Sequence, residues 1–382
     1  MPAPIPYPEV PMYPSNDHVR VVMTSYGFSI PAGNADGALA DALFGRLGAA
    51  AVLRVDDEAL DAALAAHIPW SDQRRMDRLT RLGVLATMEC FARSGLEITD
   101  ANREEVGGIY GCAFGPIAST RDFMLSGRNG IKGASPLLFP YTVVNACPGI
   151  ATILLGMRGP SSTVSGSNPV TYSFDLLASG RARALMTGGF EELTPEIVSA
   201  LQSPLAAGCD EAVERITPLA EGAAVVLLET ADSAAERGAA PICEVLGYGQ
   251  ALNLTDRAAA IENMGHIDPA AIHAAMQQAL DTTGTDAARI GLLVSLARDD
   301  NGQTGSEREA LDAVFGMENG PRVRYPKQRI GETFAASDTL ALVAARFYAE
   351  CEPDAFGGRE EKLAMVNGYQ LGGNVTSVIV KF

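Results

Sequence analysis

Six cysteines and four histidines are the residues of this sequence with the clearest potential for nucleophilic or general-base chemistry. A cysteine acts as a nucleophile only as the thiolate, which requires a base or a helix N-terminus beside it. No two cysteines have the C-x-x-C spacing of a zinc or redox site, so we expect no metal and interpret the thiols as buried packing. We interpret each histidine as a surface or helix-capping residue. The cysteines and histidines are Cys90, Cys112, Cys147, Cys209, Cys243, Cys351, His18, His67, His266 and His273.

The charge balance argues against nucleic acid as a partner. The 382 residues carry a formal net charge of −17, whereas binding to phosphates needs a concentrated basic surface. The best local basic candidate is PRVRYPKQR, which contains Arg322, Arg324, Lys327 and Arg329. No apolar run reaches the roughly 18 residues needed to span a bilayer, and the Pro-rich N-terminus lacks the basic and apolar regions of a signal peptide. We therefore expect a cytoplasmic protein without membrane contact.

The strands and helices that would position a catalytic or binding site alternate along the chain. VRVVMTSYGF (19–28) is a strand candidate, residues 37–48 look helical, and a capped helix is expected from Ser71. From about residue 240 the alternation starts again. We therefore predict two α/β halves with mostly parallel sheets, divided into a Pro-rich arm (1–17), an N-terminal half (18–240) and a C-terminal half (241–382).

Seven segments, in this order, resemble the β-ketoacyl synthases of the thiolase superfamily. The resemblance covers roughly residues 18–382. It implies a five-layer αβαβα fold of two pseudo-symmetric halves, with dimers built across the inner strands. The segments are RRMDRLTRLGVLA (74–86), PYTVVNACPGIATILLGMRGPSSTV (140–164), YSFDLLASGRARALMTGG (172–189), EGAAVVLLETADSAAERGA (221–239), EREALDAVFG (307–316), KQRIGETFAAS (327–337) and NGYQLGGN (367–374).

The nucleophile of that family is missing. In the family, the GPS-x-S-V motif is followed by a Thr-Ala-Cys-Ala-Ser-Gly turn that leads into a helix. Here GPSSTV (159–164) runs directly into Ser165-Gly166 and the next predicted helix, so the turn is shorter by about five residues. An ungapped comparison places Thr163 or Asn168 near the vacated position, and neither is a thioester nucleophile without a base beside it.

Both family histidines are also replaced. The first lies eleven residues before a glutamate that matches Glu307, which leads to Leu296. The second belongs to a Lys-x-x-x-Gly-His pattern that matches Lys327 through Glu332, so the lysine is kept and the histidine is a glutamate. An ionised Glu332 would repel a malonyl carboxylate and oppose enolate formation, and loss of one oxyanion donor alone costs about 3–4 kcal/mol.

The sequence keeps the structural motifs of the family but lacks its reacting residues. In this it is similar to the chain length factor, the non-catalytic ketosynthase subunit of type II polyketide synthases. The resemblance implies a heterodimer with an active ketosynthase, with an acyl carrier protein contacted indirectly and no cofactor in this chain. It places the tunnel and dimer contact at Phe114, Ile117, Thr120, Phe123, Met124 and Asn145.

Two alternatives remain open. One is a thiolase-fold acyltransferase with a relocated nucleophile such as Cys112, and the other is a homodimeric scaffold protein. The product and its chain length do not follow from the sequence.

Overall fold

Two groups of five strands provide the sheets of the computed structural model, which describes residues 19–45, 52–202, 217–252, 267–298, 303–316 and 320–382. The first group is β1 (Val21–Ser29), β3 (Val106–Gly111), β4 (Ser161–Val164), β5 (Ala184–Glu191) and β7 (Gly222–Thr230). The second group is β8 (Cys243–Leu252), β9 (Ile290–Ser295), β10 (Arg322–Arg324), β11 (Leu363–Tyr369) and β12 (Asn374–Lys381). A separate short parallel pair is formed by β2 (Val52–Leu53) and β6 (Leu219–Ala220).

The two groups repeat one pairing pattern. The order β1-β7-β5-β3-β4 has two antiparallel pairings followed by two parallel ones, and β8-β12-β11-β9-β10 has the same sequence of directions. β1 and β8 then pair antiparallel, which joins the groups into one ten-stranded sheet. In each half four of the five strands therefore run in the same direction, as predicted, and one strand, β7 or β12, runs against them, so the sheet is mixed. Apolar strand runs do not encode direction, and the short turn between β11 and β12 enforces an antiparallel hairpin.

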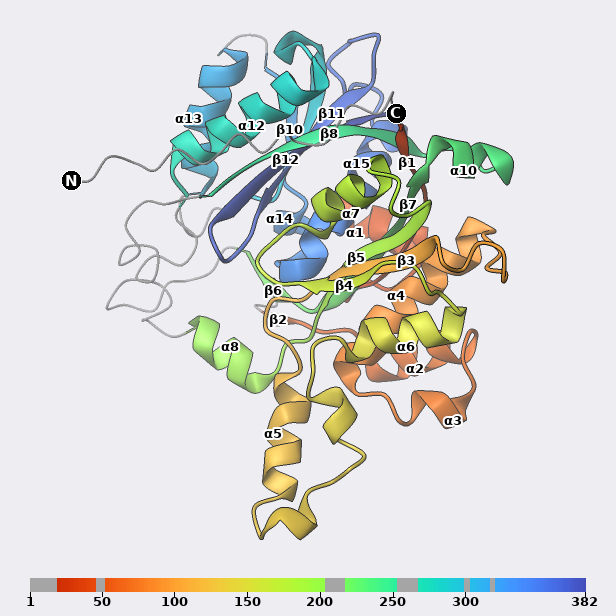
Figure 1. Cartoon of the computed structure of the whole chain (residues 1–382). Coiled ribbons are helices and arrows are strands. Elements are labelled where there is room, and N and C mark those ends of the chain that lie inside the picture. Colours follow the sequence, from red (N-terminus) through yellow and green to blue (C-terminus); the bar gives the residue numbers. More distant parts are fainter. Residues whose placement is uncertain (1–18, 46–51, 203–216, 253–266, 299–302, 317–319) are drawn as a thin grey trace, which may run out of the picture.

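Helices divide the structure into five layers, as expected (Figure 1). Two helices, α7 and α15, pack between the two halves of the sheet. Twelve residues of α15 are buried, and a helix that is apolar on all sides belongs in the centre of a protein. The outer layers cover the N-terminal half with α4 and α6 and the C-terminal half with α12 and α13. These helices are α4 (Arg78–Ser94), α6 (Ala146–Leu155), α7 (Pro169–Ala178), α12 (Pro269–Thr283), α13 (Gln303–Phe315) and α15 (Ser337–Cys351).

Several helix boundaries differ from the predicted ones because capping residues decide them. The helix expected from Ser71 is split, and α4 begins at Arg78 because the Asp77 carboxylate accepts a hydrogen bond from the Thr80 N–H at 2.9 Å. α6 ends at Leu155, where Gly156 adopts a left-handed φ of 72°. The helix predicted over 37–48 is α1, which ends at Phe44. The smaller helices are α1 (Asp36–Phe44), α2 (Asp57–Ala65), α3 (Trp70–Gln73), α8 (Pro195–Gln202), α10 (Ala231–Glu236) and α14 (Lys327–Ile330).

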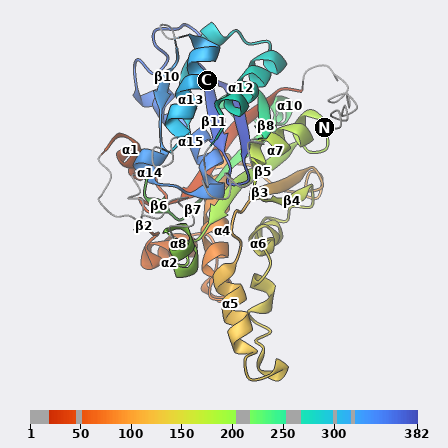
Figure 2. The same ribbon diagram turned by 90° about the vertical axis from the view of Figure 1, so that its left-hand side faces the viewer.

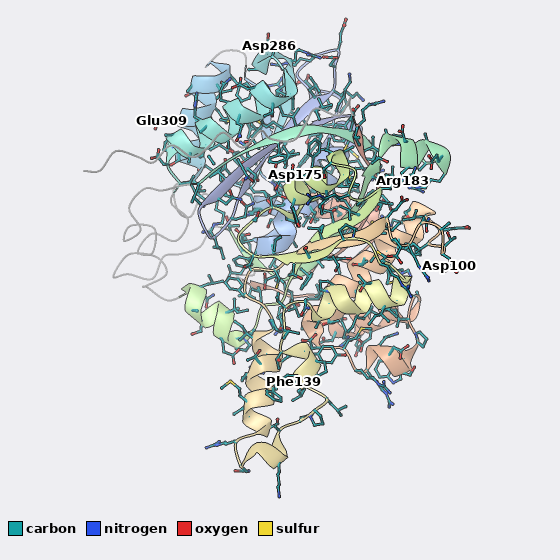
Figure 3. All side chains as sticks on the ribbon, viewed as in Figure 1. Asp100, Phe139, Asp175, Arg183, Asp286 and Glu309 are labelled. Atoms are coloured by element: carbon teal, nitrogen blue, oxygen red, sulfur yellow. The ribbon has the colours of Figure 1, made fainter. Side chains whose placement is uncertain are left out.

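A helical arm projects from the layered body (Figures 1 and 2). It consists of α5 (Ile117–Ser126), two short 3-10 turns, η1 (Ile131–Gly133) and η2 (Phe139–Tyr141), and the return into α6. Figure 3 shows Phe139 on this arm, away from the sheets. At its base, the Ser119 hydroxyl donates to the Asp77 carboxylate at 2.6 Å, which connects the arm to the start of α4.

We predict that Gly189→Ala destabilises the fold by about 2–3 kcal/mol, because a side chain here cannot be packed. A Cβ at Gly189 would lie 1.9 Å from the Ala335 carbonyl oxygen, so β5 must touch the segment before α15 without a side chain. Urea denaturation measures the change. The control is Gly37→Ala in α1, where no atom lies within 4 Å of the added Cβ and a helical alanine should stabilise slightly. Equal stability of the Gly189→Ala variant and the wild type would contradict this packing.

Candidate functional site

A pocket of about 310 Å³ lies where the carboxyl ends of β3, β4, β9 and β11 meet the start of α15. Such strand ends are where α/β proteins usually bind ligands. The pocket therefore occupies the position at which a reaction centre is expected in this fold. Its lining comes from four loops, namely 111–113, 164–167, 332–335 and 369–372, together with Arg298, Gln303, Lys327 and Asp338.

A buried ion pair dominates the pocket wall. The Lys327 Nζ lies 2.8 Å from Glu332 Oε2, and the Arg298 Nη1 lies 3.7 Å from the same oxygen. Each of the three side chains is less than 10% exposed. The other carboxylate oxygen, Oε1, accepts hydrogen bonds from the Phe334 N–H at 2.8 Å and the Ser337 hydroxyl at 3.2 Å. All of the carboxylate's strong partners therefore come from this chain.

The surroundings keep Glu332 ionised. Burial alone would raise the pKa of Glu332, but the positive charges of Lys327 and Arg298 outweigh it and hold that pKa below its usual value. The bond to Glu332 also fixes Phe334, whose φ of 49° is the one positive value at a non-glycine residue in the described ranges. Such a backbone costs about 1–3 kcal/mol and persists only where neighbours enforce it.

A second acid in the pocket behaves differently. Burial raises the pKa of Asp338 to about 6, although both of its carboxylate oxygens accept from the Gln370 amide at 2.9 Å. Deeper in the C-terminal half, Glu307 accepts from Ser295 at 2.7 Å and from Asn367 at 3.1 Å, and burial raises the pKa of Glu307. Glu307, which matches the family's glutamate in the sequence, thus links β9 and β11 by hydrogen bonds to Ser295 and Asn367.

The turn at which the sequence predicts the missing nucleophile ends in a helix cap. The turn between β4 and α7 is only residues 165–168. Asn168 Oδ1 accepts from the Val170 N–H at 2.9 Å, and its Nδ2 donates to the Thr376 hydroxyl at 3.1 Å, so its amide is fully engaged. Thr163 lies in β4 outside the pocket lining, and its hydroxyl is buried without a partner. Neither position can attack a thioester.

Cys112 is the one thiol that lines the pocket, yet its environment opposes a thiolate. Burial, and then the adjacent Glu191, raise the pKa of Cys112 well above its usual value. Its Sγ lies 3.7 Å from Glu191 Oε1, and burial raises the pKa of that carboxyl to about 8. Glu191 instead accepts the N–H groups of Ala113 and Phe114 at 2.7 and 3.2 Å, which fixes the turn after β3.

The positions of the two histidines carry different side chains. Leu296 is buried in the core and does not line the pocket, whereas Arg298, two residues further, does. Glu332 and Lys327 face the pocket, as their place in the motif implied. Of the described histidines, His67 contacts Glu89 at 3.2 Å and His273 lies in α12, and neither lines the pocket. Cys209, His18 and His266 lie outside the described residues.

Sequence reasoning missed several pocket residues because they lie far apart in the chain. Arg298, Gln303, Asp338, Tyr369 and Gln370 come from three segments. The one sequence signal that could have identified Arg298 is its place shortly after a buried strand, because polar residues at such strand ends often face a site. A single sequence gives no measure of which strand ends converge.

The residues assigned to a tunnel and dimer contact lie on the arm or at its ends. Phe114 packs against Phe334 with ring centroids 4.9 Å apart. Phe114, Ile117, Thr120 and Met124 line one shallow groove together with Pro116 and Arg121. Phe123 instead packs against Phe139 within the arm, at 5.5 Å between centroids. Asn145 is exposed where the arm returns into α6.

An apolar face runs over the arm and α6. Figure 2 shows α7, β4 and α6 in turn from the body toward the projecting α5, and among the described strands β4 is the last of the ten-stranded sheet. We call the surface of the arm and α6 the apolar face and define it by its exposed large hydrophobic residues. They are Met124, Leu125, Leu137, Phe139, Val143, Val144, Ile153 and Leu154.

The basic segment PRVRYPKQR is not a free positive surface. Arg322 pairs with Asp354 and Arg324 with Glu352, while Lys327 is buried against Glu332. A groove of about 750 Å³ beside residues 136–141 of the arm is different, because Arg74 and Arg75 line it and have no ion pair within the described ranges. Figure 3 shows other charged residues, among them Asp100, Asp286 and Glu309, at the periphery.

Comparison with known proteins gives a consistent result. Residues 45–234 match the family model of the β-ketoacyl synthase N-terminal domain. A 3-oxoacyl-(acyl-carrier-protein) synthase 2 of Staphylococcus aureus is 27% identical over 264 residues, which span 61% of this chain and 63% of that protein. A protein of the same name from Vibrio harveyi is 28% identical over 298 residues, 70% of each chain.

Solved structures share the fold at low sequence identity. The ishigamide ketosynthase/chain length factor has a TM-score of 0.75 at 20% identity, covering 95% of this chain and 98% of that one. A β-ketoacyl synthase from Burkholderia phymatum has a TM-score of 0.76 at 19% identity, covering 95% and 99%. A third match is a chain in a complex of a type II polyketide synthase acyl carrier protein with its ketosynthase bound to the hexaketide. It has a TM-score of 0.75 at 20% identity, covering 95% of this chain and 99% of that one. The thiolase-like fold is thereby confirmed. In the part of the chain that the structure describes, no helix is long and apolar enough to cross a membrane.

We predict that Lys327→Met destabilises the chain by about 3 kcal/mol at pH 7, because the buried Glu332 loses its nearest counter-charge. The folded-state pKa of Glu332 is lowered, so the pair stabilises above the carboxylate's unfolded pKa and this stability is lost as pH falls through the folded pKa. The difference from wild type should therefore persist at pH 6–7 and narrow below about pH 4 in urea denaturation. The control is Lys381→Met, an exposed partner of Glu361, with a change under about 0.5 kcal/mol. A difference that does not vary with pH would assign the loss to packing instead of charge.

We also predict that iodoacetamide modifies Cys351 but spares Cys112 in the folded protein near neutral pH. Cys351 is exposed, whereas Cys112 is buried and its raised pKa leaves little thiolate. Peptide mass mapping after timed quenching measures each site, and labelling in urea confirms that both thiols are present. Equal rates for the two thiols would revive Cys112 as a nucleophile.

Proposed function

The chain carries a β-ketoacyl synthase N-terminal domain, and from this premise we propose that it is a non-catalytic ketosynthase-like subunit, a chain length factor. In this role it pairs with an active ketosynthase and shapes the tunnel that holds the growing acyl chain. The acyl groups are carried on the phosphopantetheine of an acyl carrier protein that docks mainly on the partner, and this chain uses no cofactor of its own.

The observation that carries the proposal is the chemistry of the pocket. Condensation needs a thiolate and hydrogen-bond donors aimed at a developing negative charge. In the described ranges the pocket instead holds the protonated thiol of Cys112 and the ionised carboxylate of Glu332. Because this carboxylate already occupies the Lys327 ammonium and the Phe334 N–H, these donors are not free to stabilise an enolate, and the arrangement favours a role without catalysis. The names of the bacterial relatives denote synthases, but the Staphylococcus aureus match spans only 63% of that protein.

The apolar face supports a partner. Ile153 and Leu137 are each 80% exposed, and Phe139 is 60% exposed. Several large hydrophobic side chains this exposed, on neighbouring segments of the chain, favour a binding role. Among the described strands β4 is at the edge of the sheet, and an edge strand can pair with a second protein. Phe114, which contacts both the arm groove and Phe334, connects this face to the pocket, so a partner there would border the tunnel.

We predict that this chain pairs with a ketosynthase that has its cysteine and two histidines intact, and that the double variant Phe139→Glu with Ile153→Glu abolishes pairing. Charges placed in a desolvated interface should lower the retained partner at least tenfold, about 1.4 kcal/mol or more. Affinity capture from co-expressing cells, followed by size-exclusion chromatography, measures the ratio of the two chains. The control is Phe44→Glu, an exposed aromatic substitution on α1, which lies on the opposite side in Figure 2.

Two results would favour the alternative functions, a thiolase-fold acyltransferase or a homodimeric scaffold protein. If the lone chain elongates a malonyl substrate, or shows an acyl adduct by intact mass after incubation with an acyl-carrier thioester, it is an enzyme. If it forms a stable homodimer and ignores the ketosynthase, it is a scaffold. The expected results are neither adduct nor elongation by the lone chain, and condensation only in the mixed complex.

A further inference from the structure

The carboxylate of Glu332 is held as a bound anion would be held. Two cationic side chains, Lys327 and Arg298, meet Oε2, and two uncharged donors meet Oε1. Charge-assisted bonds of this kind are the usual means by which proteins bind carboxylates. The backbone of Glu332 is fixed too, since its N–H donates to the Pro218 carbonyl at 2.7 Å and its carbonyl accepts from the Ala220 N–H at 2.9 Å.

The same donors line the open pocket. Lys327, Arg298 and Phe334 are lining residues, so a small molecule in the pocket can reach their polar atoms once the carboxylate is removed. Without Glu332, the buried Lys327 would lose its nearest counter-charge, which favours the uptake of an anion. Asp338 also interacts electrostatically with Lys327, but its carboxyl oxygens accept from Gln370 and it makes no hydrogen bond to Lys327 among the described residues.

We propose that this pocket contains a carboxylate-binding site whose permanent occupant is the side chain of Glu332. The ligand class of the site is a small monocarboxylate, matched in size to the CH₂–COO⁻ group that ends the glutamate side chain. The tethered carboxylate competes with any free one at an effective concentration that no metabolite reaches. Because Glu332 occupies the site, the carboxylate of an extender unit cannot bind there. The extender unit is then bound by the partner ketosynthase.

That consequence rests on the proposed function, but the binding site itself does not. Its test uses the lone full-length chain and reads stability instead of condensation. Failure of pairing and failure of this proposal are therefore distinguishable.

The experiment is chemical rescue of Glu332→Ala by acetate. This variant removes the CH₂–COO⁻ group and leaves the donors in place. Thermal unfolding is followed with sodium acetate rising to about 200 mM and sodium chloride added to hold the ionic strength constant. We expect the melting temperature of Glu332→Ala to rise by about 1–3 °C, because a ligand that binds only the folded state stabilises it. The wild type should not respond.

Two control variants isolate the site. Glu361→Ala removes a surface carboxylate that also faces two cations, Arg289 and Lys381, but in contact with water. It should show no rescue by acetate. The double variant Lys327→Met with Glu332→Ala keeps the space but loses the nearest positive charge, and it should lose most of the acetate response.

The proposal is overturned if Glu332→Ala responds equally to acetate and chloride, or if the wild type gains as much as the variant. If Glu332→Ala does not accumulate as folded protein, it is refolded from urea in acetate and in chloride. A higher yield in acetate supports the site, and equal yields refute it. Glu332→Gln, which keeps the side-chain volume and loses the charge, should fold without acetate and bind it more weakly than the alanine variant.

Discussion

The buried pair of Lys327 and Glu332 is the interaction on which the arrangement of the pocket depends. Two charges withdrawn from water are stable only if each has strong partners, and here a carboxylate with four of them satisfies that condition. The same carboxylate holds Phe334 in its left-handed conformation, and the Phe334 ring meets Phe114 at the base of the arm. A single charged group therefore connects the floor of the pocket, the start of α15 and the surface where a partner is proposed.

Around this pair, the fold is the one that solved ketosynthase structures share. Strand ends from both halves converge on the pocket, and the central helices pack between the two halves of the sheet. The framework tolerates new side chains at the pocket because its own stability lies elsewhere, in the buried helices and in close backbone approaches such as Gly189 against Ala335. Side chains at the pocket can therefore change without loss of the architecture, and this separation is compatible with the non-catalytic role proposed above.

The surface combines a strongly acidic net charge with exposed hydrophobic residues. The chain has a net charge of −17, yet its arm and α6 present an exposed apolar face, and Arg74 and Arg75 border a groove beside the arm. A strongly acidic protein resists association with copies of itself through long-range repulsion, so a partner for such a face is better sought in a different chain. Phe114 lines the arm groove and packs against Phe334 of the pocket, so the proposed partner surface and the pocket are in contact through two aromatic rings.

The sequence by itself determined the alternation of strands and helices and the family resemblance, and it predicted the loss of reacting groups, because these features are local: a shortened turn after Thr163, a leucine at 296, a glutamate at 332. The reversed direction of β7 and β12, the position of the cap at Asp77 and the place of Phe123 against Phe139 followed only from the tertiary structure. So did the entry of Arg298 into the pocket and the neutralisation of Arg322 and Arg324 by acidic residues. The physical reason is that charge pairing and packing depend on which segments meet in space. Residues 298, 327 and 332 become one site only when two strand ends and a helix start are brought together.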